Sequence, residues 1–312
     1  MQVLSRNTAL NWLVLLLLAL PGTAHGATLK VNCGHREALS TINGALKLLN
    51  NLDPQGPNTL IVSGNCKENV VIQSLDRLTL TARDGASIND PSNGALPVIL
   101  IVDSQRVSVT GFTVNGGQNG VVCSGSSVCR FSGNTIQGSA GYGVVVSGSR
   151  ASFDSDTMQN NVGRGLSIIN GGAVGASSVT IQGNGDGVVL NSTGFLSADN
   201  STIRNNQRFG IWAVTNSTVR CLPCTIAGNG NDGVRIDQHS VARFDTFAGG
   251  NSITGNGGNG ISVGDLSFAF LDVGNTVAGN SGSFDVACNP RFSATRGAIA
   301  NTNGGTTNCV EP

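Results

Sequence analysis

The sequence predicts an all-β chain that coils into a parallel β-helix, a solenoid of about ten rungs with an amphipathic helix capping its N-terminal end. Three observations predict this fold. A Thr/Ser-hydrophobic pair recurs every 22 to 27 residues, a Gly-hydrophobic marker follows each pair, and the unit between them is too short to hold a helix. A nearly fixed period in this range is typical of solenoids.

The two markers define each repeat unit. Successive hydrophobic residues of the Thr/Ser pair lie 22, 22, 23, 22, 23, 27 and 24 residues apart. The Gly marker opens an alternating, β-branched segment bounded by Gly, Asn and Ser, which is typical of a strand. The pairs are Thr113-Val114, Thr135-Ile136, Thr157-Met158, Thr180-Ile181, Thr202-Ile203, Thr225-Ile226, Ser252-Ile253 and Thr276-Val277, and the markers begin at Gly120, Gly143, Gly165, Gly187, Gly210, Gly233 and Gly260.

Each unit supplies three short strands and three corners, and stacking pairs each strand with its equivalent about 4.8 Å along the axis. Inward side chains then form columns that make a continuous core. Asn residues that recur in the loops are interpreted as structural, because their amides bond neighbouring backbone. An exposed Asn column could instead contact sugar hydroxyls. The columns are Phe131 and Phe153; Ile136, Met158, Ile181, Ile203 and Ile226; and Val144, Leu166, Val188, Ile211, Val234 and Ile261, and the asparagines are Asn160, Asn184, Asn206, Asn229, Asn256 and Asn280.

Both ends of a solenoid need a cover, since an open edge pairs with other chains. A helix within Glu37 to Asn50 is predicted to cover the first rung. We divide the mature chain into an N-terminal cap at 27–57, a β-helix at 58–287 and a disulfide-tied C-terminal cap at 288–312. The apolar face of the predicted helix consists of Leu39, Ile42, Leu46 and Leu49.

Residues 1–26 have the pattern of a secretory signal peptide. Arg6 precedes an apolar run from Trp12 to Leu20, and Ala24-His25-Gly26 supplies small residues for cleavage. The run is shorter than the about 20 apolar residues that span a membrane, and no later segment replaces it. The mature chain is therefore expected to be secreted, into a periplasmic or extracellular space, with no membrane span.

All eight cysteines lie in the mature part, an even number in a compartment that favours disulfides. Eight cysteines can be joined into four disulfides in about 105 ways. These cysteines lie in neighbouring pairs along the chain, which favours disulfides within each pair. The first and last bridges would tie down the two ends. The expected pairs are Cys33–Cys66, Cys123–Cys129, Cys221–Cys224 and Cys288–Cys309.

Charge and histidine content exclude several classes of partner. Without Arg6 the chain has 17 Lys and Arg against 18 Asp and Glu, scattered along its length, so no nucleic-acid footprint is present. Neither a metal nor a cofactor is expected. Only His35 and His239 remain after processing, and the cysteines are assigned to bridges. Two G-x-G-x-x-G segments and the Cys221-Leu-Pro-Cys224 segment lie between strands, so neither a dinucleotide site nor a redox site is predicted.

The repeats resemble the right-handed β-helix repeats of the pectate-lyase-like superfamily over roughly residues 58–287. The segment Gly64-Asn-Cys-Lys-Glu-Asn-Val-Val-Ile72 is similar to the Gly-x-Tyr-x-Glu-x-Val-x-Ile segment of pectin-methylesterase-like helices. The resemblance implies a right-handed, single-stranded parallel β-helix. Members include lyases, hydrolases, esterases and epimerases of acidic polysaccharides, but also adhesins and non-catalytic surface proteins.

In related β-helices the substrate groove runs along one sheet, which the resemblance assigns to the strands opened by the Gly marker. Alternation turns Trp212 and Arg235 outward there on adjacent rungs, where a Trp face could stack on a sugar and an Arg could pair with a uronate carboxylate. The alternative is a solvated sheet face with a cross-rung Arg–Asp pair. The candidate carbohydrate-binding residues are Trp212, Arg235, Asp237, Arg208, Asp232 and His239.

The catalytic motifs of the superfamily are missing. There is no Gln-Asp-Thr-Leu, Asp-Phe-Ile-Phe, Asn-Thr-Asp or Asp-Pro-His, and Asp237-Gln-His239, the nearest approach to the last, lies at an ordinary corner. Loops of about four to eight residues leave no long insertions to build groove walls, and only the unit around Thr246 to Gly250 is stretched. The sequence therefore favours an exported glycan-binding or scaffold protein, with a polysaccharide-active lyase, hydrolase or esterase as the alternative.

Overall fold

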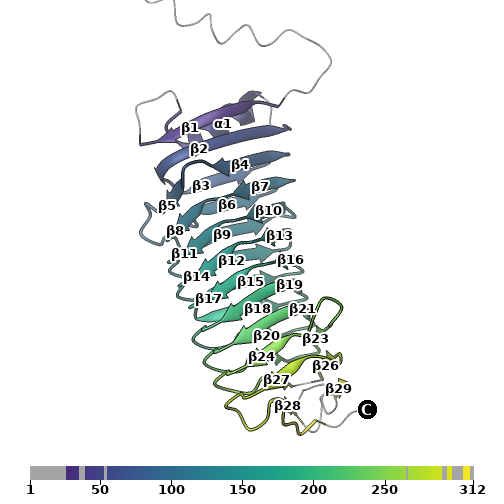
Figure 1. Cartoon of the computed structure of the whole chain (residues 1–312). Coiled ribbons are helices and arrows are strands. Elements are labelled where there is room, and N and C mark those ends of the chain that lie inside the picture. The colour runs from purple at the N-terminus through teal and green to yellow at the C-terminus, as the bar shows by residue number, and fades with distance from the viewer. Residues whose placement is uncertain are drawn as a thin grey trace, which may run out of the picture.

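A computed structural model describes residues 26–34, 39–52, 55–264, 266–289, 294–296 and 305–309. The described strands wind into an elongated parallel β-helix with the only described helix at one end (Figure 1). The predicted fold class is therefore confirmed. All of the predicted signal peptide except Gly26 lies outside the described residues, as do His35 and much of the predicted C-terminal cap.

One face of the coil is a ten-stranded sheet, one strand per rung. Parallel pairing joins each strand to its equivalent on the next rung, so that Val144 lies beside Leu166 and Leu166 beside Val188. The strands are β3 (Val70–Gln73), β6 (Ile99–Val102), β9 (Asn119–Ser124), β12 (Tyr142–Ser147), β15 (Arg164–Ile169), β18 (Asp186–Asn191), β20 (Ile211–Ala213), β22 (Val234–Ile236), β25 (Ile261–Val263) and β28 (Val286–Cys288).

The other two faces form one nineteen-stranded sheet, because long strands such as β19 and β21 continue around a corner from one face to the next. Its strands are β1 (Thr28–Cys33), β2 (Asn58–Lys67), β4 (Leu78–Ala82), β5 (Ser87–Asn89), β7 (Val107–Thr110), β8 (Thr113–Asn115), β10 (Val128–Ser132), β11 (Thr135–Gln137), β13 (Arg150–Asp154), β14 (Thr157–Gln159), β16 (Ala173–Ser177), β17 (Thr180–Gln182), β19 (Phe195–Arg204), β21 (Thr218–Ala227), β23 (Val241–Phe244), β24 (Ser252–Thr254), β26 (Phe268–Leu271), β27 (Thr276–Ala278) and β29 (Ala294–Arg296).

The core consists of the predicted inward columns. The Phe131 and Phe153 rings stack with centroids 4.8 Å apart, one rung spacing. The Ile136 and Val144 columns are buried throughout. Because β-branched and aromatic side chains fit a pleated, packed surface, each column favours the strand that carries it.

A buried ladder of asparagine amides runs along one corner of the coil. Each Nδ2 donates to the Oδ1 of the next rung, as from Asn184 to Asn206 at 3.1 Å and from Asn206 to Asn229 at 2.9 Å. The ladder starts at Asn161, whereas Asn160 adopts a left-handed backbone conformation beside it. Its members are Asn161, Asn184, Asn206, Asn229, Asn256 and Asn280, so these loop asparagines are structural.

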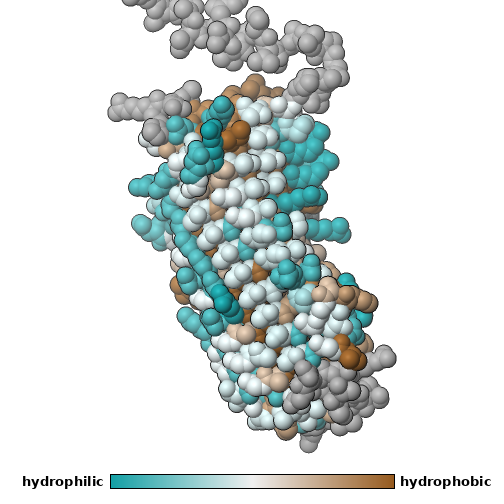
Figure 2. All heavy atoms as spheres, in the orientation of Figure 1, coloured by the Kyte–Doolittle hydropathy of each residue, from teal (hydrophilic) through white to brown (hydrophobic). Residues whose placement is uncertain are grey.

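A second amide ladder lies on the outer surface. Gln159 Nε2 donates to Gln137 Oε1 at 2.8 Å, and Gln182 Nε2 to Gln159 Oε1 at 3.1 Å. The ladder extends from Asn89 and Asn115 and ends at the Arg204 guanidinium. Figure 2 shows a hydrophilic column over the region of β8, β11, β14 and β17.

The capping helix α1 (Ile42–Leu52) begins later than the predicted Glu37 and ends two residues beyond Asn50. A distant carboxylate sets its first turn, because Glu68 accepts hydrogen bonds from the backbone N–H groups of Ile42 at 2.7 Å and Asn43 at 2.9 Å. A carboxylate at this position satisfies unpaired donors and complements the helix dipole. The strand β1 precedes the helix in the chain and pairs in parallel with β2.

Three of the four predicted disulfides are present: Cys33–Cys66, Cys123–Cys129 and Cys288–Cys309. The predicted Cys221–Cys224 bridge is wrong, because both residues are buried free thiols. They lie inside the coil on either side of the Leu222-Pro223 corner of β21, and the Cys224 thiol lies 3.7 Å from the Ala198 carbonyl oxygen. A hydrogen bond with Cys224, together with burial, raises the pKa of the Cys221 thiol well above its usual range.

The two thiols are expected to be unreactive in the folded protein, because burial keeps them protonated and closed to reagents. A thiol reagent should therefore label none of the cysteines under native conditions and two after unfolding without a reductant. Peptide mapping would assign the label to Cys221 and Cys224. Complete absence of label in the unfolded chain would contradict the free-thiol assignment.

Candidate functional site

The strands β20 and β22 bring the main candidate residues together on the ten-stranded sheet. Trp212 pairs in register with Arg235, and Val189 and Ser262 lie on the flanking rungs. Neighbouring residues on each strand point into the core, so alternation leaves Trp212 and Arg235 on the outer surface.

A single carboxylate organises this surface. Asp237 Oδ2 accepts a hydrogen bond from Trp212 Nε1 at 3.2 Å and from Arg235 Nε at 2.6 Å. The Asp237 side chain is 13% exposed and that of Arg235 44% exposed, so the carboxylate lies beneath the guanidinium. The indole and the guanidinium are thereby held side by side.

Phe209 belongs to the same surface but was not among the residues proposed from the sequence. Its ring centroid lies 5.4 Å from that of Trp212, at an interplanar angle of 42°, and 5.8 Å from Arg235 Cζ. Phe209 directly precedes the Gly210 marker, which was the only sign in the sequence that it lies near Trp212. The direction of its side chain could not be predicted, because a loop residue does not follow the alternation of a strand. We call Phe209, Trp212, Arg235 and Asp237 the Trp212 patch.

Arginine side chains continue on the neighbouring rungs. Arg208 forms an ion pair with the buried Asp186, whose carboxylate also accepts the Phe209 backbone N–H at 3.4 Å. Two rungs before Arg208, Arg164 Nη1 donates to Ser167 Oγ at 3.0 Å and its guanidinium lies 5.0 Å from the Tyr142 ring centroid. Ser167 is therefore covered despite facing outward.

Two of the proposed residues lie at the edge of this arrangement. Asp232 is largely buried and accepts the Asn259 backbone N–H at 2.8 Å, so its carboxylate shapes a corner. His239 is exposed at a left-handed corner position, and no hydrogen bond or ion pair among the described residues joins it to the Trp212 patch.

The carboxylates of this sheet are held by cations or backbone donors. Asp186 and Asp237 each form an ion pair with an arginine. A carboxyl group with a raised pKa does occur, but in the interior. Burial raises the pKa of Asp156 to about 6, although hydrogen bonds from Asn134 and Asp154 act to lower it. At 1% exposure Asp156 is closed to a polymeric substrate.

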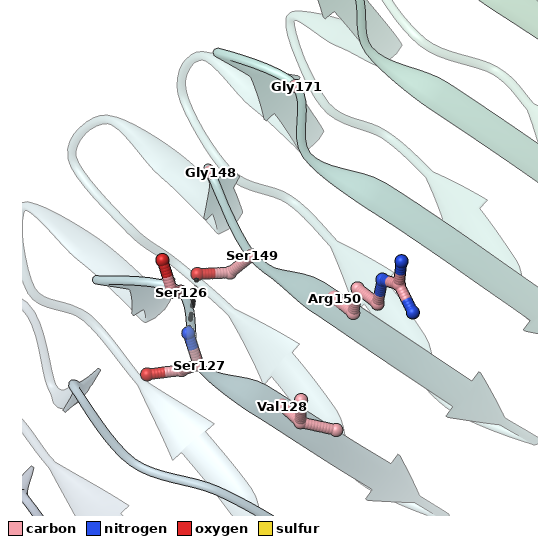
Figure 3. A pocket seen from close by; sticks show the side chains of 7 residues that line it. All are labelled: Ser126, Ser127, Val128, Gly148, Ser149, Arg150 and Gly171. Carbon is pink, nitrogen blue, oxygen red and sulfur yellow. Dashed lines mark hydrogen bonds between the residues drawn. The ribbon is translucent and has the colours of Figure 1, made fainter.

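Surface recesses lie at other places on the coil. One of about 270 Å³ lies at the corner after β9 and β12, where Figure 3 shows three serine side chains close together and Arg150 extending away from them. Ser149 Oγ accepts the Ser127 backbone N–H at 3.0 Å. The lining consists of Ser126, Ser127, Val128, Gly148, Ser149, Arg150 and Gly171, with no carboxylate or histidine.

A recess of about 550 Å³ lies beside the outer amide ladder and is lined in part by Asp90. Burial raises the pKa of Asp90, but hydrogen bonds from Ser92, Asn69 and Gly94 outweigh it and hold the pKa well below its usual range. This carboxylate thus accepts four hydrogen bonds, from Asn69, Ser92 and Gly94, and shapes the loop. A third recess, of about 480 Å³, adjoins the Cys33–Cys66 disulfide and Glu68.

The described residues include one cluster with the spacing of metal ligands, Cys33, Cys66 and Glu68. Its sulfur atoms are joined in a disulfide and its carboxylate caps α1, so all three side chains already have structural partners. Within the described part of the chain, no helix combines the length and the hydrophobicity needed to cross a membrane.

Comparisons with known proteins agree with this architecture. A family model described as a right handed beta helix region matches residues 119–306. No curated protein sequence matches the chain.

Several solved structures are similar in fold. Pectate lyase Pel9A superposes with a TM-score of 0.60 at 11% identity, covering 85% of this chain and 79% of that one. The A-module of the mannuronan C-5 epimerase AlgE4 from Azotobacter vinelandii gives 0.58 at 12% identity, covering 81% and 88%. The protein ORF18 of Geobacillus virus E2 gives 0.56 at 13% identity, covering 85% and 57%. At these identities the likeness establishes a shared fold.

Proposed function

This chain belongs to the right handed beta helix family, and we propose that it is an exported, non-catalytic protein that binds an acidic polysaccharide at the Trp212 patch. The observation that carries the proposal is the position of the Asp237 carboxylate between the Trp212 indole and the Arg235 guanidinium. A flat apolar ring beside a fixed cation matches a sugar ring that carries a carboxylate. Export is supported by the three disulfides and by the predicted signal peptide.

The neighbouring rungs favour a polymer over a single sugar. Arg208 and Arg235 lie on adjacent rungs, about 4.8 Å apart along the axis, and their side chains are 57% and 44% exposed. A chain that runs along the sheet would meet both guanidinium groups and the intervening aromatic pair. Pectate and mannuronan, the polymers named in two neighbours of similar fold, are the first ligands to test.

Binding accounts for the site better than catalysis does. A glycosidase needs one protonated and one ionised carboxyl group across the scissile bond. Asp186 and Asp237 are both paired with arginine, and the remaining candidate, Asp232, accepts a backbone N–H. Each of these three carboxylates thus has a structural partner, and the proposal assigns them the role of positioning the arginines and the corner. Ultraviolet detection of unsaturated products or release of reducing ends from either polymer would overturn the non-catalytic part of the proposal.

Replacing Trp212 by alanine is expected to weaken binding of an oligogalacturonate or oligomannuronate by about 5- to 150-fold. The estimate takes stacking of a ring on an aromatic side chain as roughly 1–3 kcal/mol. Titration calorimetry on wild type and variant measures the loss.

The matched control is Phe247→Ala, which removes an aromatic ring that is 84% exposed at a different corner. Both variants should unfold near the wild-type denaturant midpoint, since neither removes a core residue. Equal affinities for wild type and Trp212→Ala would show that the Trp212 patch is a solvated scaffold face.

A further inference from the structure

A second cluster of arginines and aromatic rings lies on the nineteen-stranded sheet, on β21, β23 and β26. Arg220 pairs in register with Arg243, and Arg243 with Phe270, so these three outward side chains follow one another on consecutive rungs. Figure 2 shows hydrophobic and hydrophilic residues side by side over this region at the lower right. The cluster belongs to a different face from the Trp212 patch, because it lies in the other sheet.

One buried carboxylate positions both guanidinium groups. Asp245 Oδ2 accepts a hydrogen bond from Arg220 Nε, and its Oδ1 lies 3.6 Å from Arg243 Nε. The Asp245 side chain is 3% exposed, whereas those of Arg220 and Arg243 are 39% and 54% exposed. The cluster therefore contains two basic side chains and one acidic side chain.

The contacts to Asp245 leave the outer edges of the guanidinium groups available. Both contacts use Nε, and no hydrogen bond among the described residues engages a terminal nitrogen of Arg220 or Arg243. A guanidinium binds a planar carboxylate or a sulfate through paired N–H donors. Two such groups one rung apart, held from below by a shared carboxylate, form a preorganised anion site.

Aromatic rings complete this surface. Arg243 Cζ lies 5.2 Å from the Phe270 ring centroid, and the Phe268 and Phe270 rings lie 4.3 Å apart at an angle of 52°. Both rings are partly exposed, so they offer an apolar face directly beside the cations. A small free anion would use the guanidinium groups alone. A sugar that carries an anionic group would use both features.

We propose that Arg220, Arg243 and Phe270 form a second binding site for an anionic polysaccharide, at which the guanidinium groups take a carboxylate or sulfate and the phenylalanine rings take the sugar face. Arg130 lies earlier in the same outward column. It is exposed, and no ion pair or ring contact involves it among the described residues, so it provides an internal comparison.

The test uses the full mature chain carrying Trp212→Ala, which removes the main contact of the first site. Binding of hexagalacturonate, a sulfated glucan hexamer and neutral maltohexaose is measured by calorimetry at low and moderate salt. The double variant Arg220→Lys/Arg243→Lys keeps both charges on Asp245 but loses the paired donors. We expect it to bind the preferred anionic oligomer at least about tenfold more weakly, and the control Arg130→Lys/Arg150→Lys to bind it unchanged.

The two anionic oligomers separate carboxylate from sulfate recognition, and dependence of either on Arg220 and Arg243 supports the site. Phe270→Ala should also lose affinity for the oligomer, and it serves as the second variant if the lysine pair disturbs the fold. Hydrogen exchange should show ligand protection in β21, β23 and β26. Absence of anionic binding in the Trp212→Ala chain, or full affinity in the lysine variant, would overturn the inference. Loss of binding by Trp212→Ala in the wild-type background tests the first site separately.

Discussion

Asn206→Leu is expected to destabilise the β-helix by about 3–6 kcal/mol, because it interrupts the buried asparagine ladder. Asn206 Oδ1 accepts the Asn184 backbone N–H at 3.0 Å and Asn184 Nδ2 at 3.1 Å, and its own Nδ2 donates to Asn229 Oδ1 at 2.9 Å. Leucine has a similar volume but satisfies none of these groups. Each buried polar group that loses its partner costs about 1–3 kcal/mol. Asn184 Nδ2 keeps its bond to the Met158 carbonyl and Asn229 Oδ1 keeps the Asn206 backbone N–H, so the total lies below three full losses.

Denaturant unfolding followed by circular dichroism measures this loss. The matched control is Gln182→Leu, which interrupts the outer amide ladder at a partly exposed position where water replaces the lost partners. Its destabilisation should stay below about 1 kcal/mol. If the two variants lost similar free energies of unfolding, burial of the inner ladder would add nothing to the stability that the ladder contributes.

The stability of the folded chain should contain a pH-dependent contribution from Asp156. Burial raises the pKa of this carboxyl group to about 6 in the folded state, above its ordinary value of 3.8. The folded state therefore binds the proton more tightly than the unfolded chain does. The stabilising contribution is fully present below about pH 4 and is lost as the pH rises through about 6.

The shift corresponds to about 3 kcal/mol, since each pKa unit is worth about 1.4 kcal/mol. Between pH 4 and pH 8, the free energy of unfolding of wild type should therefore fall by about 3 kcal/mol relative to that of Asp156→Asn. The variant does not share this loss, because asparagine has no ionised form to bury. Urea titrations across this range measure the difference. The matched control is Asp199→Asn, which makes the same substitution at an exposed position of β19. A constant difference between Asp156→Asn and wild type would contradict a raised pKa.

The two arginine–aromatic clusters have one local design on different faces. In each, a largely buried aspartate accepts a hydrogen bond from the Nε of an arginine, and the outer part of the guanidinium faces solvent. The Trp212 patch adds an indole hydrogen-bonded to the same carboxylate, whereas the second cluster adds a second arginine. Because the rungs between them form a packed core, both surfaces are expected to stay rigid when a ligand binds.

Local and periodic features of the chain were predictable from the sequence. The repeat spacing predicted the coil, and the alternation on each strand predicted which residues face the core, because a strand places successive side chains on opposite faces. The same alternation predicts that Trp212 and Arg235 face outward on adjacent rungs, and the two residues pair in register on β20 and β22. These conclusions depend only on the repeat period and on strand geometry.

Contacts made by corners and by residues far apart in the sequence needed the tertiary structure. Thr41 is a local N-cap of α1, because its Oγ1 accepts the Gly44 backbone N–H at 3.1 Å. Glu68 binds the first two N–H groups of the helix from outside it, and only the tertiary structure places that carboxylate there. Cys221 and Cys224 are close in sequence, which predicted a disulfide between them. In the structure both are free thiols that face the core on either side of a corner. A corner residue has no fixed alternation, so the direction of its side chain depends on the stacking of neighbouring rungs. For the same reason Asp245, which follows β23, could be placed between Arg220 and Arg243 only by the folded coil.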